Sequence, residues 1–276
     1  MSKIIKILSI SLLTVFSFFY TNKMIDVSKK NDPIMKKIIE ISDKLKISSV
    51  NSSYDKDYLT LGKKGLEVDI KVSYEKMKKL GEYNENLIIY KEINGNSLNY
   101  TYDKFIVSLN KKEKVVSIIF KIKDSKNIYN ILKILKNNNI KAMFFIDGKW
   151  GYDNKSVLDD IKKDNHLLAG LSYNNSFDKK SMNKVSKIID KYNKNRYCYA
   201  SYDNYELLNI CKSLKLFTIK PVEIEKDIYI NVKERLDKGL ILSFNNGDIV
   251  VKELDLSIKY ILQRGYEIKL LDDVIN

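Results

Sequence analysis

The chain has 276 residues, 44% of them hydrophobic and 30% charged, which is enough for two folded domains and excludes a disordered or multi-span membrane protein. Two prolines, ten glycines and two cysteines exclude collagen-like and disulfide-scaffold architectures. The net charge of +14 comes almost entirely from lysine, so we expect no nucleic-acid partner, because arginine dominates nucleic-acid readout.

A basic start, MSKIIK, leads into an apolar run that ends at Tyr20. At ~1.5 Å per residue, a helix over 4–20 is long enough for a short membrane span. Neither a small-x-small cleavage pattern nor a cysteine for lipid attachment follows the run, so residues 1–22 are predicted to be an uncleaved membrane anchor. A cleaved signal peptide is the alternative. Both predictions place the rest of the chain on the extracytoplasmic side, beginning with a polar stalk over 23–33.

A small α+β domain is predicted over 34–109. Pro33 suits the start of a helix near 34–46. Residues 65–93 contain an alternating strand, a helix that ends near Gly81, and a second strand. Asn94 and Gly95 then form a typical hairpin turn.

From 115 to 276 the pattern changes to a regular alternation of apolar strands and amphipathic helices. Strands that are apolar on both faces indicate a parallel sheet covered by helices. We therefore expect an α/β fold, a distorted (β/α) barrel with its functional residues at the carboxyl ends of the strands. An open doubly wound sheet is the alternative, although no glycine-rich phosphate turn follows the first strand. The strands are expected at 115–122, 141–146, 166–173, 196–200, 215–220, 238–244 and 266–271.

Five segments in this region resemble the NodB-type polysaccharide deacetylases, carbohydrate esterase family 4. They are NILKILKNNNIKAMFFIDGKW (130–150), DNHLLAGLSYNN (164–175), NYELLNICKSLKL (204–216), GLILSFNNGD (239–248) and QRGYEIKLLDDVI (263–275). The resemblance implies the NodB barrel fold. With GLEVDIKVSYEKMKK (65–79) ahead of the barrel, the chain also resembles membrane-anchored, sporulation-associated deacetylase-like proteins, which implies a role in the cell wall or spore envelope.

The catalytic positions of that family are replaced here. The family uses an Asp-His-His set to bind zinc or another divalent metal, a second Asp as base and a His as acid. The family base falls on Lys121, the metal Asp on Ile122, the two metal histidines on Leu171 and Asn175, and the acid on Phe244. If the following helix sets the register, the family's R-P-P-Y-G motif falls on Tyr197 to Ser201, whereas a slip of one residue would keep Arg196 near its place, and no role carries over. The resemblance therefore implies a degenerate site without metal or cofactor, and a pseudoenzyme.

Other polar and aromatic side chains follow the predicted strand ends. Asp124, Asp147, Asp203 and Asp248 offer oxygen ligands for Ca²⁺ or Mg²⁺, although loop and helix-start roles are the simpler interpretation. A glycan groove would stack sugar rings on aromatic side chains, and the alternative for these side chains is a place in the core. The candidates are Trp150, Tyr173, Tyr199 and Tyr202.

The single histidine and the two cysteines favour structural roles. His166 matches a family histidine that is not a ligand, and we expect a hydrogen-bonded residue at the start of a strand. In an exported chain Cys198 and Cys211 could form a disulfide, but two buried thiols are the favoured interpretation.

Three functions remain open from the sequence. The first is a non-catalytic, membrane-anchored deacetylase-like protein that binds wall glycan or a wall-remodelling protein. The second is an active metal-dependent N-deacetylase that uses ligands foreign to the family. The third is a structural scaffold.

Overall fold

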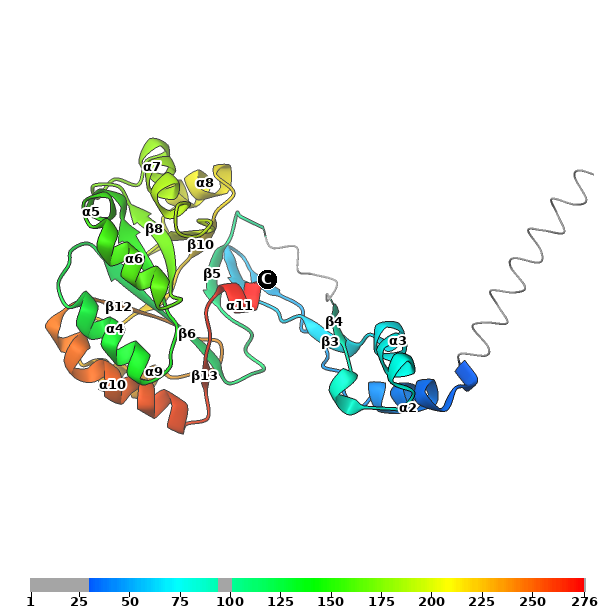
Figure 1. Cartoon of the computed structure of the whole chain (residues 1–276). Coiled ribbons are helices and arrows are strands. Elements are labelled where there is room, and N and C mark those ends of the chain that lie inside the picture. Colours follow the sequence, from blue (N-terminus) through cyan, green and yellow to red (C-terminus); the bar gives the residue numbers. More distant parts are fainter. Residues whose placement is uncertain (1–29, 94–100, 276) are drawn as a thin grey trace, which may run out of the picture. The chain divides into compact units, whose positions relative to one another are not determined.

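The computed structural model describes residues 30–93 and 101–275 (Figure 1). The predicted anchor over 1–22 and the predicted turn at Asn94 and Gly95 lie outside these residues. The chain divides into two compact units, the first formed by Met1–Ser49 and Lys64–Asn94, the second by Val50–Lys63 and Gly95–Asn276. None of the helices within 30–93 and 101–275 combines the length and the apolar character needed to cross a membrane.

The first unit is a small α+β structure. It holds α2 (Pro33–Ser42), β3 (Gly65–Val68), α3 (Ile70–Leu80), the short 3₁₀ helix η1 (Glu85–Leu87) and β4 (Tyr90–Ile93). The Asp32 side chain caps α2 through the Ile34 N–H at 2.9 Å, and Gly81 ends α3 with a left-handed φ of 87°. The antiparallel pair β3 and β4 packs with both helices around Ile38 and Met77. The helix start at Pro33 and the helix end at Gly81 are confirmed.

The second unit is built on one large curved sheet. Its strand order is β1-β2-β5-β10-β9-β8-β7-β6-β12-β11, and β13 pairs with the start of β6. Every pair is parallel except β1 with β2. Because no pairing joins β11 to β1 in the described part of the chain, the barrel stays open. This confirms the distorted (β/α) barrel. The strands are β1 (Ser53–Asp55), β2 (Tyr58–Thr60), β5 (Phe105–Ser108), β6 (Val115–Ile122), β7 (Met143–Asp147), β8 (Leu167–Ser172), β9 (Tyr197–Tyr199), β10 (Phe217–Ile219), β11 (Val222–Glu223), β12 (Ile241–Asn245) and β13 (Glu267–Ile268).

The two faces of this sheet bury different side chains. On β6, Phe120 and Ile122 pack against the helices in one core cluster, whereas Ile119 lies in a second cluster on the inner face of the barrel. Successive strand residues point to opposite faces, which produces the unbroken apolar runs in the sequence. The helices are α4 (Ile128–Asn137), α5 (Gly148–Asp153), α6 (Lys155–Lys163), α7 (Lys179–Ile189), α8 (Tyr205–Ser213), α9 (Ile228–Arg235), α10 (Asp248–Gln263) and α11 (Asp272–Ile275) (Figure 1).

The division into units differs from the predicted boundary at 109–115. Residues 50–63 and the strand β5 belong to the second unit, although both precede residue 115 in the chain. Their strands extend the large sheet, since β5 pairs with β10 and β2 pairs with β5. Pairing between strands so distant in sequence leaves no local signal, so the change of pattern near 115 marks the start of the strand–helix alternation rather than the edge of the unit.

Candidate degenerate deacetylase site

A cavity of about 140 Å³ opens at the carboxyl ends of β6, β8 and β9. Lys121 and Leu171 line it, together with Tyr199 and Tyr202. The structure therefore brings together two of the five replaced catalytic positions and two of the four candidate glycan-binding aromatics. Phe177, which sequence reasoning missed, also lines this rim cavity and is 39% exposed.

The ammonium of Lys121 is paired with two carboxylates, from Glu223 at the end of β11 and from Glu225 just after that strand, and β11 is separated from β6 by β12. Its Nζ lies 2.7 Å from Glu223 Oε2 and 3.4 Å from Glu225 Oε1. The side chains of Lys121 and Glu223 are only 17% and 21% exposed, so most of this pair is shielded from water. The family position for a general base is thus occupied by an ammonium that is paired with carboxylates.

Glu223 also anchors the neighbouring tyrosine. The Tyr199 hydroxyl donates to Glu223 Oε1 at 2.7 Å and lies 2.7 Å from Ser243 Oγ on β12. Burial raises the pKa of Glu223, but the donors Lys121, Ser201 and Tyr199 outweigh burial and hold this pKa below its ordinary value. Burial, with the Glu223 carboxylate, raises the pKa of Tyr199 well above its ordinary value. Both shifts move the pKa away from the near-neutral range that suits a general acid or base.

Two other replaced positions face away from the cavity. Ile122 is fully buried in the cluster between the sheet and the helices. Phe244 lies in the same cluster, with its ring centroid 5.9 Å from that of Phe120. Strand alternation makes Asn245, the partner of Lys121 across the β6–β12 pair, the residue on the inner side of this strand end. Phe244 therefore does not reach the place that the family's acid would need.

Asn175 takes part in a loop that is organised by Asp147. Asn174 and Asn175 have left-handed φ values of 52° and 59°, and their backbone N–H groups donate to the Asp147 carboxylate at 3.1 and 3.0 Å. The Ser172 hydroxyl donates to it at 2.5 Å. Burial raises the pKa of Asp147, but the hydrogen bonds from Ser172 and the loop hold it below its ordinary value. The role of Asp147 is to cap α5 and to hold this loop, as the helix-start interpretation predicts.

Trp150 and Tyr173 lie outside the residues that line the rim cavity. The Trp150 indole donates to Ser125 Oγ at 3.1 Å, and the Tyr173 ring lies 4.8 Å from Lys184 Nζ. Trp150 and Tyr173 therefore make their contacts beside α5 and α7, whereas Tyr199 and Tyr202 line the rim cavity.

The donors present do not fit the family's divalent metal. An ammonium, two aliphatic side chains and one exposed amide stand at the base and ligand positions, whereas such a cation requires carboxylate and imidazole. Within 30–93 and 101–275, no three His, Cys, Asp or Glu side chains gather closely enough to hold an ion. The other strand-end acids have protein partners: Asp203 binds Lys220 at 2.6 Å, Asp248 binds Lys126 at 2.8 Å and Asp124 binds Asn246 at 2.7 Å.

His166 has the structural role that the sequence predicts. It is 1% exposed and precedes β8, and its Nδ1 accepts a hydrogen bond from the Ala142 N–H at 3.2 Å. Burial lowers the pKa of His166 to about 4. The imidazole is therefore neutral near pH 7 and has no access to the rim cavity.

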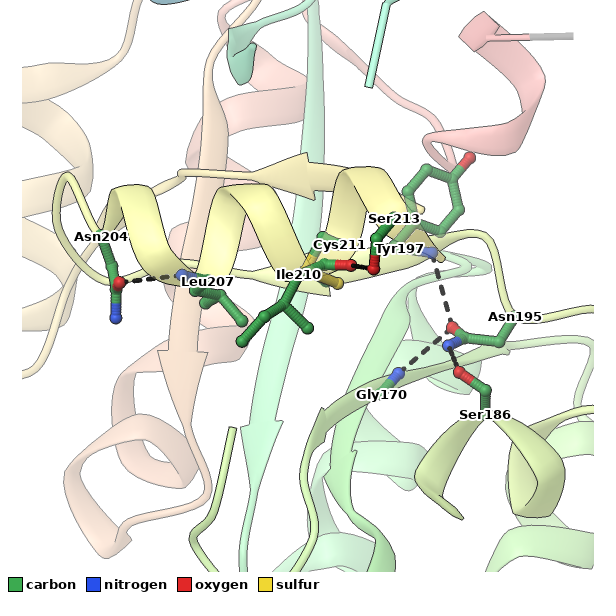
Figure 2. The surroundings of a disulfide bond; sticks show 10 residues. Gly170, Ser186, Asn195, Tyr197, Asn204, Leu207, Ile210, Cys211 and Ser213 are labelled. Atoms are coloured by element: carbon green, nitrogen blue, oxygen red, sulfur yellow. Dashed lines mark hydrogen bonds between the residues drawn. A yellow bond between two sulfur atoms is a disulfide. The ribbon is translucent and has the colours of Figure 1, made fainter. Parts of the chain in front are cut away.

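The cysteines are joined, so the prediction of two free thiols is wrong. Cys198 on β9 and Cys211 on α8 form a disulfide with Cα atoms 6.3 Å apart (Figure 2). The helix α8 packs back against the sheet after β9, so the two buried cysteines lie in the same core cluster. Figure 2 also shows the Asn195 amide, which donates to Ser186 Oγ at 2.8 Å and accepts from the Gly170 N–H at 3.3 Å. Strand β9, which carries Tyr199, is thus joined to α8 by the disulfide, and Asn195, which precedes the strand, is hydrogen-bonded to β8 and α7.

Comparison with known proteins agrees with this geometry. Residues 108–204 match the sequence family described as polysaccharide deacetylase. The uncharacterized protein YlxY of Bacillus subtilis (strain 168) is 26% identical over 173 residues, which cover 61% of this chain and 54% of YlxY. The match therefore spans about half the length of that relative.

Two solved structures share the fold. BA3943 from Bacillus anthracis, a CE4 family pseudoenzyme, has a TM-score of 0.67 and 22% identity, covering 89% of this chain and 96% of that one. Bc1960, a peptidoglycan N-acetylglucosamine deacetylase, has a TM-score of 0.56 and 16% identity, covering 61% and 91%. The match over residues 108–204 and the shared barrel fold make the second unit of this chain similar to the NodB-type polysaccharide deacetylases, carbohydrate esterase family 4.

Proposed function

We propose that this chain is a catalytically inactive, membrane-anchored deacetylase-like protein that binds cell-wall or spore-envelope glycan, alone or with a wall-remodelling protein. The observation that carries the proposal is the ion pair of Lys121 with Glu223 at the base position of the family. A paired ammonium cannot take a proton from water, and it repels a divalent cation. BA3943 provides a precedent for this fold in a pseudoenzyme, and a mutant of BA3943 with restored enzymatic activity is known.

The glycan part of the proposal is supported by the rim cavity. Tyr202 is 66% exposed at its edge, and Phe177 lies on the same cavity. Exposed aromatic faces beside amide and hydroxyl groups suit the stacking of a sugar ring. Peptidoglycan is the substrate class named for the relative Bc1960, so N-acetylated wall glycan is the ligand that we propose.

The extracytoplasmic part is supported by two features. The disulfide between Cys198 and Cys211 is of a kind that forms and persists in oxidising compartments. The apolar run over 4–20 follows a basic start, as in anchors and signal peptides.

The absence of catalysis is tested by product formation and metal binding. We expect the full-length chain, purified in a neutral detergent, to release no acetate from peptidoglycan or chitooligomers above the buffer blank. We also expect less than one equivalent of Zn²⁺ or Co²⁺ after dialysis. Bc1960 serves as the positive control for acetate release. Acetate release by this chain together with stoichiometric metal would overturn the proposal and would favour an active deacetylase with unfamiliar ligands.

Glycan binding is tested at the rim cavity. We expect Tyr202→Ala to weaken binding of chitooligomers or peptidoglycan fragments about three- to tenfold, which corresponds to the ~0.5–1.5 kcal/mol of one aromatic contact. Tyr129→Ala is the matched control, because Tyr129 is similarly exposed at 57% but lies on α4. Trp150→Ala should also leave binding within about twofold, since Trp150 does not line the cavity. Equal losses in all three variants, measured by calorimetry, would reject the cavity as the glycan site.

A further inference from the structure

The strongest unassigned feature of the second unit is a row of lysines on α7. Lys180, Lys184 and Lys187 follow one another at intervals of four and three residues, and Lys191 continues the interval of four just after the helix ends. At 100° per residue these positions fall on one face, opposite the buried residues Met182, Val185 and Ile189. All four lysines are exposed. We call this row the α7 lysine stripe.

The stripe has no acidic partner within residues 30–93 and 101–275. The helix α7 itself contains no Asp or Glu, and its capping residue Asp178 is engaged by Ser176 and Ser181. Among the residues that the structure describes, no carboxylate lies within 4.0 Å of any ammonium of the stripe. Other helices differ, since Lys149 pairs with Asp153 on α5 and Lys259 pairs with Asp255 on α10.

This arrangement is unfavourable for the isolated helix. Like charges at i,i+3 and i,i+4 repel each other across one helix face. A bound line of negative charge would relieve that repulsion, and the lysines would displace the counterions condensed on that polyanion. With ~1.5 Å rise per residue, successive ammonium groups start from positions roughly 4.5 to 6 Å apart along the axis. The stripe is therefore a straight row of positive charge that is one side chain wide.

We propose that the α7 lysine stripe binds a linear polymer of phosphate groups. Lysine binds phosphate as a compact point charge, and α7 has no arginine, whose fork would serve bidentate recognition of a single carboxylate or phosphate group. A bilayer surface is disfavoured, because α7 exposes no large apolar side chain that could enter the membrane interface. Single-stranded nucleic acid is disfavoured, because α7 has no aromatic residue and the single ring of Tyr173 beside Lys184 cannot stack successive bases.

The stripe shares no residue with the rim cavity, so this inference stands apart from the proposed glycan binding. The experiment measures binding of fluorescein-labelled long-chain inorganic polyphosphate to the full-length chain by anisotropy. The variant Lys180→Gln/Lys184→Gln/Lys187→Gln should bind at least tenfold more weakly at about 50 mM salt. The slope of log affinity against log salt should fall by about 2, because three phosphate contacts are lost at ~0.7 each.

The matched control removes the same charge elsewhere. Lys133, Lys162 and Lys163 are exposed lysines on α4 and α6 without a carboxylate partner in the described residues, and their triple change to Gln should alter affinity less than twofold. The triple change of the stripe to Arg keeps the charge and should keep the binding, which guards against a folding artefact. Equal losses in both Gln triples would mean attraction by net charge alone and would overturn the proposal. Absence of polyphosphate binding by the wild-type chain, or tighter binding of a single-stranded oligonucleotide of equal charge, would also overturn it.

Discussion

Lys121→Met is expected to lower the free energy of unfolding of the second unit by about 2 kcal/mol. The substitution leaves the Glu223 carboxylate in place without its ammonium partner. Loss of one partner from a fully buried pair costs about 3–5 kcal/mol, and partial exposure of both side chains reduces the cost here. Trp150, the only tryptophan of the chain, lies in this unit, so urea unfolding followed by tryptophan fluorescence reports on this unit alone.

The pH dependence of this variant has a defined sign. In the wild-type chain the pKa of Glu223 lies below its ordinary value of 4.5, so the pair stabilises the fold above pH 4.5 and this contribution is lost as the pH falls through the folded-state pKa. Without Lys121, the pKa of Glu223 should be higher than in the wild-type chain, because the strongest donor that opposes burial is lost. As the pH falls, the wild-type chain loses the contribution of the pair, so the stability difference between the variant and the wild type should shrink.

Two further variants separate the ion pair from other effects. Lys121→Met/Glu223→Gln should recover most of the lost stability, because no unpaired buried charge remains. Lys123→Met changes an exposed neighbour without a carboxylate partner in the described residues and should cost less than about 0.5 kcal/mol. If the stability loss of the double variant equals the sum of the losses of its two single variants, the contact between Lys121 and Glu223 contributes nothing to the free energy of unfolding.

Cys198→Ala/Cys211→Ala is expected to lower the free energy of unfolding of the second unit by about 3 kcal/mol. The disulfide closes a loop with a sequence separation of 13, for which the loss of chain entropy in the unfolded state gives roughly this value. The expected readout is a lower urea midpoint by tryptophan fluorescence. The wild-type chain, kept reduced during refolding, should show a similar loss.

The same cysteines report on the compartment. Protein isolated from the cell envelope should show no free thiol when it is denatured without a reductant, whereas chain made in a reducing cytoplasm should show two. Two free thiols in envelope-derived protein would contradict the disulfide. Identical urea midpoints for the oxidised and reduced chains would contradict the stabilising role that we assign to it.

The family-like barrel and the replacement of the family's catalytic residues could be predicted from the sequence. The segment 115–122 and its successors are apolar on both faces because each strand is covered by helices on one side and by the barrel interior on the other. The replacement of a base by Lys121 and of a ligand by Leu171 is a matter of residue type, which needs no coordinates. Short elements escaped prediction, notably α5 with its two glycines and the two-residue strand β11.

The partners of these residues could not be predicted. Glu223 meets Lys121 across a sequence separation of 102, because β11 and β6 both pair with β12. Phe244 misses the site by a single residue, since a strand turns each successive side chain to the opposite face. Residue type and apolar periodicity are local properties, so the sequence by itself determined the barrel and the missing catalytic groups. Strand order, and the face of the sheet to which each side chain points, depend on pairings between distant segments. Only the tertiary structure therefore decided that an ion pair fills the site, which aromatic side chains line the cavity, and that Cys198 is joined to Cys211.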